Sequence, residues 1–302
     1  MAPMEVSTPL RSTSIENESI AYALRQVAEI LQAQGANAYR INAYRRAAET
    51  VEGTAPLRGI YKTQGRTGLE ALPGVGQVIA NAIAEMLDTG HWSQLERLRG
   101  SLDPATLFRT VPGIGPELAE RIHDELGIDT LEALELACYD GRLEAVPGVG
   151  HRRVASIRAA LADLLGHARL RTRTRQGDGE PPIAMLLDVD REYREAVRTD
   201  RLPRIAPRRF NPDNRSWLPI LHTMRGPWHF TALYSNTARA HELGRTRDWV
   251  VLYFYDADHP EQQRTIVTEQ RGALGGLRVV RGREADCEAY YGTAGTPAAH
   301  QH

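Results

Sequence analysis

The segment Leu69-Glu-Ala-Leu-Pro-Gly-Val-Gly-Gln-Val-Ile-Ala80 decides the fold of the first half of this 302-residue chain. Its centre, Pro73-Gly74-Val75-Gly76, stands between two apolar stretches, and the second of them has helical spacing. Glycine permits the positive φ of a tight turn and lets another molecule approach the backbone closely. A helix that begins directly after such a turn presents unpaired N–H groups and the positive end of its dipole. The segment therefore predicts a helical hairpin whose turn exposes backbone amides.

The same pattern recurs at Pro112-Gly113-Ile114-Gly115 and at Pro147-Gly148-Val149-Gly150, and we call the three copies the first, second and third turns. Exposed amides at a helix N-terminus bind phosphate, and contacts to the DNA backbone carry no base information. Three copies favour binding to a phosphodiester backbone over hairpins that serve packing alone. The predicted DNA contacts are the turn glycines and the basic residues after the third turn: Gly74, Gly76, Gly113, Gly115, Gly148, Gly150, His151, Arg152 and Arg153.

The composition limits how the protein can bind DNA and which kinds of site it can contain. The net charge is −1, so DNA binding must depend on local patches rather than on a basic protein. Cys138 and Cys287 lack metal-ligand spacing, which argues against a zinc site and a disulfide framework. No signal peptide or long apolar run is evident, so we expect a cytoplasmic, nucleoid-associated protein with no membrane partner.

The chain reads as an all-α half followed by an α+β domain. Arginines and the sequence Gly177-Asp178-Gly179 mark a linker between the halves. We expect a disordered start (1–15), a helical domain with the first turn (16–95), a helical domain with the other two turns (96–166), the linker (167–182), the α+β domain (183–291) and a flexible tail (292–302).

Short apolar runs after the linker predict strands. These runs are Ile183–Val189, Trp217–Leu221, His229–Tyr234, Trp249–Tyr255, Thr265–Thr268 and Leu277–Val280. Helices are expected near Arg191–Val197 and Asn236–Leu243.

A more specific resemblance comes from Gly35-Ala-Asn-Ala-Tyr-Arg-Ile-Asn-Ala-Tyr-Arg-Arg-Ala-Ala48 together with the first turn. This stretch resembles the N-terminal domain of family X DNA polymerases, bacterial members in particular, and residues to about 165 resemble the fingers of that family. The resemblance covers half of the chain. It implies binding to the 5′-phosphate side of gapped DNA, with Arg40, Tyr44 and Arg45 holding the end phosphate. The alternative is a core aromatic at Tyr44 and a solvated face of arginines.

The resemblance does not extend to the catalytic palm, which needs three carboxylates for two Mg²⁺ ions and a Gly-Ser turn. No Gly-Ser turn follows the linker. On a strand, Asp188 and Asp190 would point to one side, but a third carboxylate is not evident. We therefore expect no polymerase activity, and place Mg²⁺ or another divalent cation at Asp188 and Asp190 if anywhere.

Lyase chemistry of this family needs a lysine amine that forms a Schiff base. In relatives with that activity the lysine follows the last turn glycine by six residues, and here that position is Ala82. The chain has one lysine, Lys62, expected in the loop before the hairpin, so Lys62 or the N-terminal amine would have to serve.

His222 and His229 stand in two predicted strands around Gly226-Pro227, and His229 shares a face with Thr231. A His-x-Thr pair can bind and protonate a phosphoryl oxygen, although buried histidines are often core residues. Three hypotheses follow. The first is a DNA-binding factor of repair or recombination whose C-terminal half is an accessory domain that either binds a repair-protein partner or processes DNA. The second is a DNA-processing enzyme centred on Asp188, Asp190, His222 and His229, and the third is an interaction scaffold.

Overall fold

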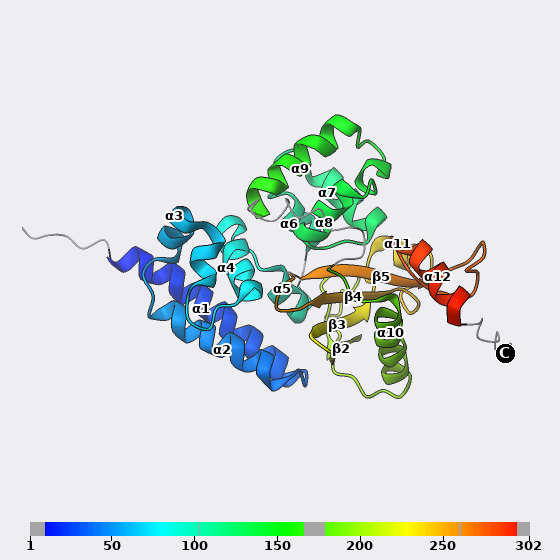
Figure 1. Ribbon diagram of the computed structural model, residues 1–302, viewed down its shortest axis with the longest axis horizontal. Helices are drawn as coiled ribbons and strands as arrows, with labels where there is room; N and C mark the ends of the chain where they lie inside the picture. The colour runs from blue at the N-terminus through cyan, green and yellow to red at the C-terminus, as the bar shows by residue number, and fades with distance from the viewer. Residues whose placement is uncertain (1–9, 102, 166–178, 260, 295–302) are drawn as a thin grey trace, which may run out of the picture. The chain divides into compact units, whose positions relative to one another are not determined.

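The computed structural model describes residues 10–101, 103–165, 179–259 and 261–294, and it divides the chain into two compact units between Leu95 and Glu96 (Figure 1). The first unit and the start of the second are helical, and a six-stranded antiparallel sheet with helices follows. This confirms the predicted fold class, an all-α half followed by an α+β domain. Among the described residues, no helix is long and apolar enough to cross a membrane.

The described part of the first unit up to Thr89 forms two helical hairpins: α1 (Leu10–Ala33) with α2 (Ala38–Glu52), and α3 (Leu57–Glu70) with α4 (Gln77–Thr89). Gly35 at φ +72° lets the chain reverse after α1, and the Asn37 side chain caps α2 by accepting from the Tyr39 amide at 2.8 Å. The helix α1 begins inside the segment expected to be disordered. After Pro9 no proline or glycine interrupts the chain before Gly35, and serine and threonine alone do not end a helix.

The two remaining hairpin turns share one hydrophobic core in the second unit. The helical part of the second unit begins with α5 (Ser93–Arg99), within which the boundary between the units lies. It continues with α6 (Pro104–Phe108), α7 (Pro116–Leu126), α8 (Leu131–Tyr139), the 3₁₀ turn η1 (Leu143–Ala145) and α9 (His151–Leu165). Residues of both hairpins, among them Ile114, Val149 and Ile157, pack into this core. The second and third turns therefore belong to one domain, formed by α6 to α9, which we call the tandem-hairpin domain.

The α+β domain is an antiparallel meander with strands in chain order. Its elements are α10 (Ile183–Arg198), β1 (Arg204–Ile205), β2 (Leu218–Arg225), β3 (Trp228–Tyr234), α11 (Ala238–Glu242), β4 (Val250–Tyr255), β5 (Gln262–Thr268), β6 (Arg278–Val280) and α12 (Glu284–Ala294). Figure 1 shows α10 against the sheet, where the Tyr193 hydroxyl donates to the Pro219 carbonyl at 3.0 Å and accepts from the Tyr234 amide.

The strand expected at Ile183–Val189 is wrong, because these residues form the first half of α10. Ile183, Leu186, Leu187 and Tyr193 are buried at helical spacing, so the apolar run is one face of a longer amphipathic helix. A short apolar run fits a strand or a buried helix equally well. Because residues two apart lie on nearly opposite sides of a helix, Asp188 and Asp190 do not form the pair expected on a strand.

The ends of the domain also differ from the expectation. Most of the predicted linker, 166–178, lies outside the described residues, but Glu180 is anchored by an ion pair with Arg264 at 2.6 Å. At the other end α12 continues to Ala294, so the first three residues of the predicted tail are helical. The rest of that tail and residues 1–9 lie outside the described residues.

Candidate nucleic-acid interface

The three Pro-Gly-x-Gly turns adopt the same backbone conformation. The first glycine of each has a left-handed φ, with values of +74° at Gly74, +91° at Gly113 and +82° at Gly148. The residue between the glycines donates its amide to the carbonyl three residues earlier, as in Val75 to Leu72, Ile114 to Val111 and Val149 to Val146, at 3.0, 3.1 and 3.0 Å. Glycine is required at the first position because a side chain strongly disfavours this conformation.

Burial alternates within each turn. The middle residues Val75, Ile114 and Val149 are 3, 6 and 6% exposed, whereas both glycines of every turn are exposed. The apolar side chain thus fastens the turn to the core, and the backbone on either side of it faces solvent. Such a surface offers amides to a ligand without side chains in the way.

The helices after the turns begin without a side-chain cap. Gly76 and Gly115 are the N-caps of α4 and α7, both with an extended backbone and no side-chain cap bond. Elsewhere in the chain, α2, α8 and α11 have side-chain caps from Asn37, Thr130 and Thr237. An uncapped helix start leaves N–H donors for an anion.

Arginines surround the third turn. Arg121 of α7 donates from Nη1 to the Pro147 carbonyl at 2.7 Å, and Arg153 of α9 donates from Nη1 to the Gly148 carbonyl at 3.2 Å. His151 and Arg152 are exposed at the start of α9. The positive charge expected here is therefore present, and Arg121 adds to it. Arg121 was missed because it reaches the turn through packing of α7 and carries no local sequence signal.

The second turn is less favourable to an anion. The first residue of α7 is Pro116, which has no N–H, and the next residue is Glu117, which is exposed. A carboxylate at a helix N-terminus stabilises the helix but competes with a bound phosphate. The charge around the third turn is thus more favourable for DNA than that around the second.

The first turn lies against α2. The Thr50 hydroxyl donates to the Pro73 carbonyl at 2.8 Å, and a Cβ placed on Gly74 would lie 3.5 Å from Cβ of Arg46. Arg46 is exposed, so its guanidinium can approach a phosphate bound at Gly74. Sequence reasoning selected its neighbour Arg45 and missed Arg46.

The three residues expected to hold the end phosphate occupy different environments. Tyr44 is 2% exposed, donates its hydroxyl to Gln94 Oε1 at 2.8 Å and packs on the Trp92 ring with centroids 5.8 Å apart. Arg40 is also buried, at 6% exposure, whereas Arg45 is exposed and donates to Gln32. The structure thus places Tyr44 in the core and leaves Arg45 on the surface.

Lys62 lies on α3, the first helix of the first hairpin, rather than in the loop where it was expected, and it is exposed. Ala82 is buried on α4, at 5% exposure. No lysine other than Lys62 exists in the sequence, so the helix α4 offers no amine for Schiff-base chemistry.

The carboxylates of α10 pair with arginines. Asp190 is 1% exposed and accepts from Arg278 Nη2 at 2.6 Å and from Arg194 Nε at 3.1 Å. Asp188 accepts from Arg225 Nε at 2.8 Å, and this hydrogen bond lowers the pKa of its carboxyl. Both carboxylates therefore serve as partners of guanidinium groups.

The histidines lie on the opposite side of the sheet. Thr223 and Arg225 contact α10 through Glu192, and His222 alternates with them along β2, so it points to the other face. There His222 Nδ1 lies 3.1 Å from the Thr231 hydroxyl, and the His229 ring stacks on Tyr255.

The sheet therefore separates His222 and His229 from Asp188 and Asp190. Among the described residues, no group of three or more His, Cys, Asp or Glu side chains could hold a metal ion.

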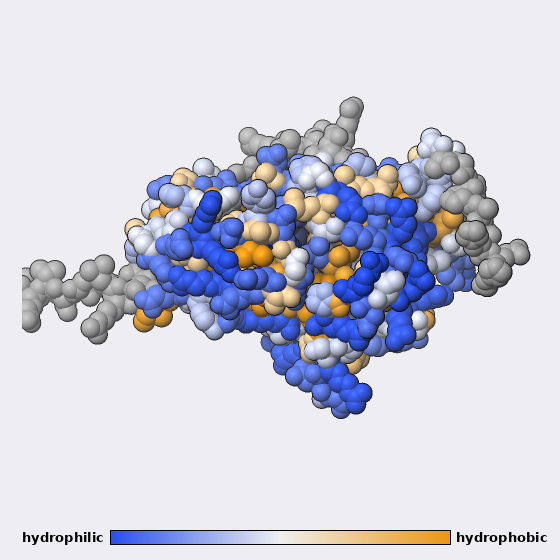
Figure 2. All heavy atoms as spheres, turned by 90° about the horizontal axis from the view of Figure 1, so that it is seen from below, coloured by the Kyte–Doolittle hydropathy of each residue, from blue (hydrophilic) through white to orange (hydrophobic). Residues whose placement is uncertain are grey.

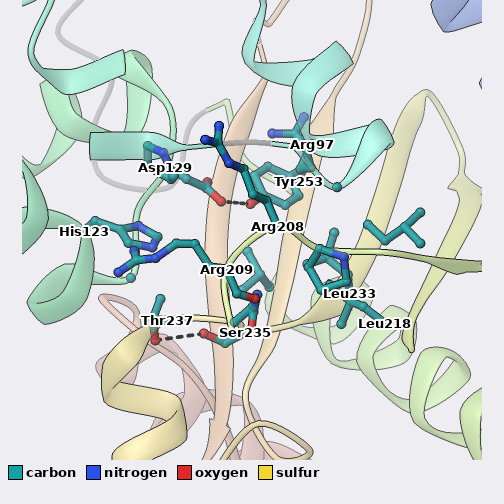
Figure 3. Close-up of a pocket in the computed structure, with 17 residues that line it drawn as sticks. Arg97, His123, Asp129, Arg208, Arg209, Leu218, Leu233, Ser235, Thr237 and Tyr253 are labelled. Atoms are coloured by element: carbon teal, nitrogen blue, oxygen red, sulfur yellow. Dashed lines mark hydrogen bonds between the residues drawn. The ribbon is translucent and has the colours of Figure 1, made fainter. Parts of the chain in front are cut away.

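A mostly apolar hollow of about 70 Å³ lies within the second unit, between the tandem-hairpin domain and the histidine-bearing face of the sheet (Figure 3). The Tyr253 hydroxyl donates to Asp129, and the guanidinium of Arg97 lies 3.6 Å from the Tyr253 ring centre. Burial raises the pKa of both Asp129 and Tyr253. Sequence reasoning missed this network, which joins α5, the loop after α7 and β4.

Comparison with known proteins agrees with the geometry of the turns. A helix-hairpin-helix domain family matches residues 15–92, and a SAM-like helix-hairpin-helix tandem family matches 66–126 and 105–163. The N-terminal half of this chain therefore contains helix-hairpin-helix domains, and these matches support DNA as its partner.

The chain is also similar to the DNA polymerase/3′-5′ exonuclease PolX of Bacillus subtilis (strain 168), with 25% identity over 150 residues. The aligned part is 49% of this chain and 25% of that polymerase, so the chain spans about a quarter of the relative's length. This confirms the predicted resemblance to family X polymerases over about half of the chain. The family matches end at residue 163, before the α+β domain.

Proposed function

We propose that this chain is a non-sequence-specific DNA-binding protein of repair or recombination that holds gapped, nicked or end-containing DNA by its backbone. The observation that carries the proposal is the geometry shared by the three turns: exposed glycine amides beside a buried apolar residue, with uncapped helices after Gly76 and Gly115. Amides arranged in this way favour phosphate and do not distinguish bases.

The preference for interrupted DNA rests on the division of the turns between two units. The first turn lies beside Arg45 and Arg46 of α2 in one unit, and the other two turns share a core in the second. Contact surfaces on two separate compact units suit a duplex that is interrupted. The similarity to PolX is consistent with this preference, and the α+β domain would serve as an accessory domain that binds a repair protein.

Binding of the full chain to matched duplexes tests the proposal. The probes are one labelled sequence prepared intact, nicked, gapped and with an exposed end, each titrated over a series of salt concentrations. Backbone contacts predict an affinity that falls steeply with salt and is higher for the interrupted duplexes. Absence of binding at low salt, or equal affinity for all four probes, would contradict the proposal.

A single substitution isolates the role of the turn amides. Gln77→Pro removes one N–H at the first position of α4, where proline is tolerated in helices and where α7 already carries Pro116. The extended backbone of Gly76 is compatible with a following proline. A hydrogen bond to a charged acceptor contributes about 1.5–3 kcal/mol, so we expect Gln77→Pro to weaken binding about tenfold or more. Gln77→Ala, which keeps the amide, is the matched control.

A further inference from the structure

Large apolar side chains are few and scattered on the surface of the described residues. Figure 2 shows a face on which hydrophilic residues predominate around small apolar patches. One exposed aromatic stands out in the α+β domain: Phe210, in the loop between β1 and β2, is 48% exposed and has φ +52°. A phenylalanine with positive φ is an unusual conformation that the surrounding structure must hold in place.

The surroundings of Phe210 hold its ring in one position. The His241 ring packs on it with centroids 4.3 Å apart and an interplanar angle of 37°. Asn236 fixes both sides of this contact, because its Oδ1 accepts from His241 Nε2 at 2.7 Å and its Nδ2 donates to the Arg209 carbonyl at 3.0 Å. Burial and the nearby Arg209 lower the pKa of His241, which favours the neutral ring. The Phe210 ring thus contacts His241, and the guanidinium carbon of Arg209 lies 5.3 Å from its centre.

The loop is also tied to the tandem-hairpin domain. Arg209 forms ion pairs with Glu120 at 3.2 Å and Asp124 at 3.6 Å, both on α7. These carboxylates balance the charge of Arg209, whereas Arg208 is exposed and forms no ion pair with a carboxylate of the described residues. A rigid exposed aromatic and an exposed arginine therefore stand two residues apart in the sequence, on either side of Arg209, which pairs with α7.

We propose that Phe210, supported by His241, is a stacking platform for an unpaired base of the bound DNA, and that Arg208 contacts the adjoining phosphate. Aromatic side chains stack on any base, and arginines beside them follow the backbone. This inference rests on the proposed function, because it assigns the single-stranded part of interrupted DNA to a particular loop.

The position on α7 is consistent with this assignment. Glu120 and Asp124 lie about 6 and 12 Å along the helix axis from Pro116, where the second turn ends. Phosphates of one DNA strand recur every 3.4 Å along the axis, so this separation corresponds to about two to four phosphates. A strand held at the second turn and running along α7 would reach Arg209, the neighbour of Phe210, within about two to four nucleotides.

The test measures binding of the full chain to a nicked duplex and to a gapped duplex whose unpaired stretch contains the fluorescent base 2-aminopurine. Stacking predicts quenching of that base by the wild type, and about five- to hundredfold weaker binding of gapped DNA by Phe210→Ala. Phe210→Leu should weaken binding similarly, and Phe210→Trp should restore it. Nicked DNA, which lacks unpaired bases, should bind all variants alike. Leu243→Ala removes a comparably exposed apolar side chain at the end of α11 and is the control.

The outcomes separate this inference from the proposed function. If the wild type binds gapped DNA and Phe210→Ala and Phe210→Leu change neither affinity nor quenching, the stacking platform is excluded while DNA binding stands. If the wild type binds none of the probes, the proposed function itself fails. For Arg208, we expect Arg208→Gln to reduce the salt dependence of gapped-DNA binding by about one phosphate contact, and an unchanged slope would remove Arg208 from the site.

Discussion

The hairpin turns expose polar groups to solvent, whereas the α+β domain pairs polar groups within the protein. In the turns, glycine amides face solvent, and Arg152 is exposed beside the third turn. In the α+β domain, Asp190 is almost completely buried and bound to Arg278 and Arg194. A polar group already satisfied within the protein stabilises the fold, whereas one left to solvent is available for a ligand. This difference is our reason for proposing the turns, rather than the aspartates of α10, as the place where DNA binds.

The largest expected effect comes from removing the buried carboxylate. Asp190→Ala leaves Arg278 with Asp248 as its remaining carboxylate partner and should lower the free energy of unfolding by about 3 kcal/mol or more. Urea denaturation measures the change. DNA affinity of the folded variant should stay close to that of the wild type. A stable Asp190→Ala protein with altered DNA binding would show that the comparison between the two regions is wrong.

The next effect concerns the basic residues of the third turn. The double variant Arg152→Gln, Arg153→Gln should reduce the slope of log affinity against log salt by about two. At physiological salt this corresponds to weaker binding on the order of ten- to hundredfold. Exposed arginines of the α+β domain, changed together as Arg198→Gln and Arg201→Gln, provide a control of equal charge. Equal losses in both double variants would indicate a general charge effect instead of a contact at the turn.

A smaller effect of opposite sign is expected at the second turn. Glu117→Gln removes the carboxylate that competes with phosphate at the start of α7 and should tighten DNA binding a few-fold, since such interactions contribute about 0.3–1 kcal/mol. The same titrations measure it. Unchanged affinity would mean that DNA does not contact the second turn.

The smallest expected effect is on the pH dependence of the free energy of unfolding and concerns Asp188. Arg225 lowers the pKa of this carboxyl, so its contribution to stability is present above its unfolded pKa and is lost as the pH falls through the lower folded value. Asp188→Asn should cost less than about 1 kcal/mol at pH 7, because the group is partly exposed. The difference from the wild type should shrink at pH 3. Urea midpoints at both pH values measure it, and a constant difference would refute the assignment.

The turns were predictable because their signal is local. Proline and glycine at fixed positions set the φ values, the helix start and the exposed amides within a few residues. The arginines that packing adds to them were not predictable, since Arg46 and Arg121 reach the turns from neighbouring helices.

The α+β domain was less predictable because its structure depends on contacts between residues that lie far apart in the sequence. The strands β2 to β6 were located approximately from the sequence. The apolar run from Ile183 fits a strand and a helix equally well, and only the burial of its residues at helical spacing shows that it is a helix. Arg278, the closer of the two arginine partners of Asp190, lies 88 residues away along the chain. No local pattern identifies such a pair, so exposed carboxylates and buried ion-pair partners look alike in the sequence.

Amide hydrogen exchange of the full chain, free and bound to a gapped duplex, tests the central claim most directly. The account predicts slower exchange on DNA binding in the segments that contain Gly74–Gly76, Gly113–Gly115 and Gly148–Gly150, with α10 and β6 unchanged. Protection confined to other segments, with the three turns exchanging as fast in the complex as in the free protein, would contradict it.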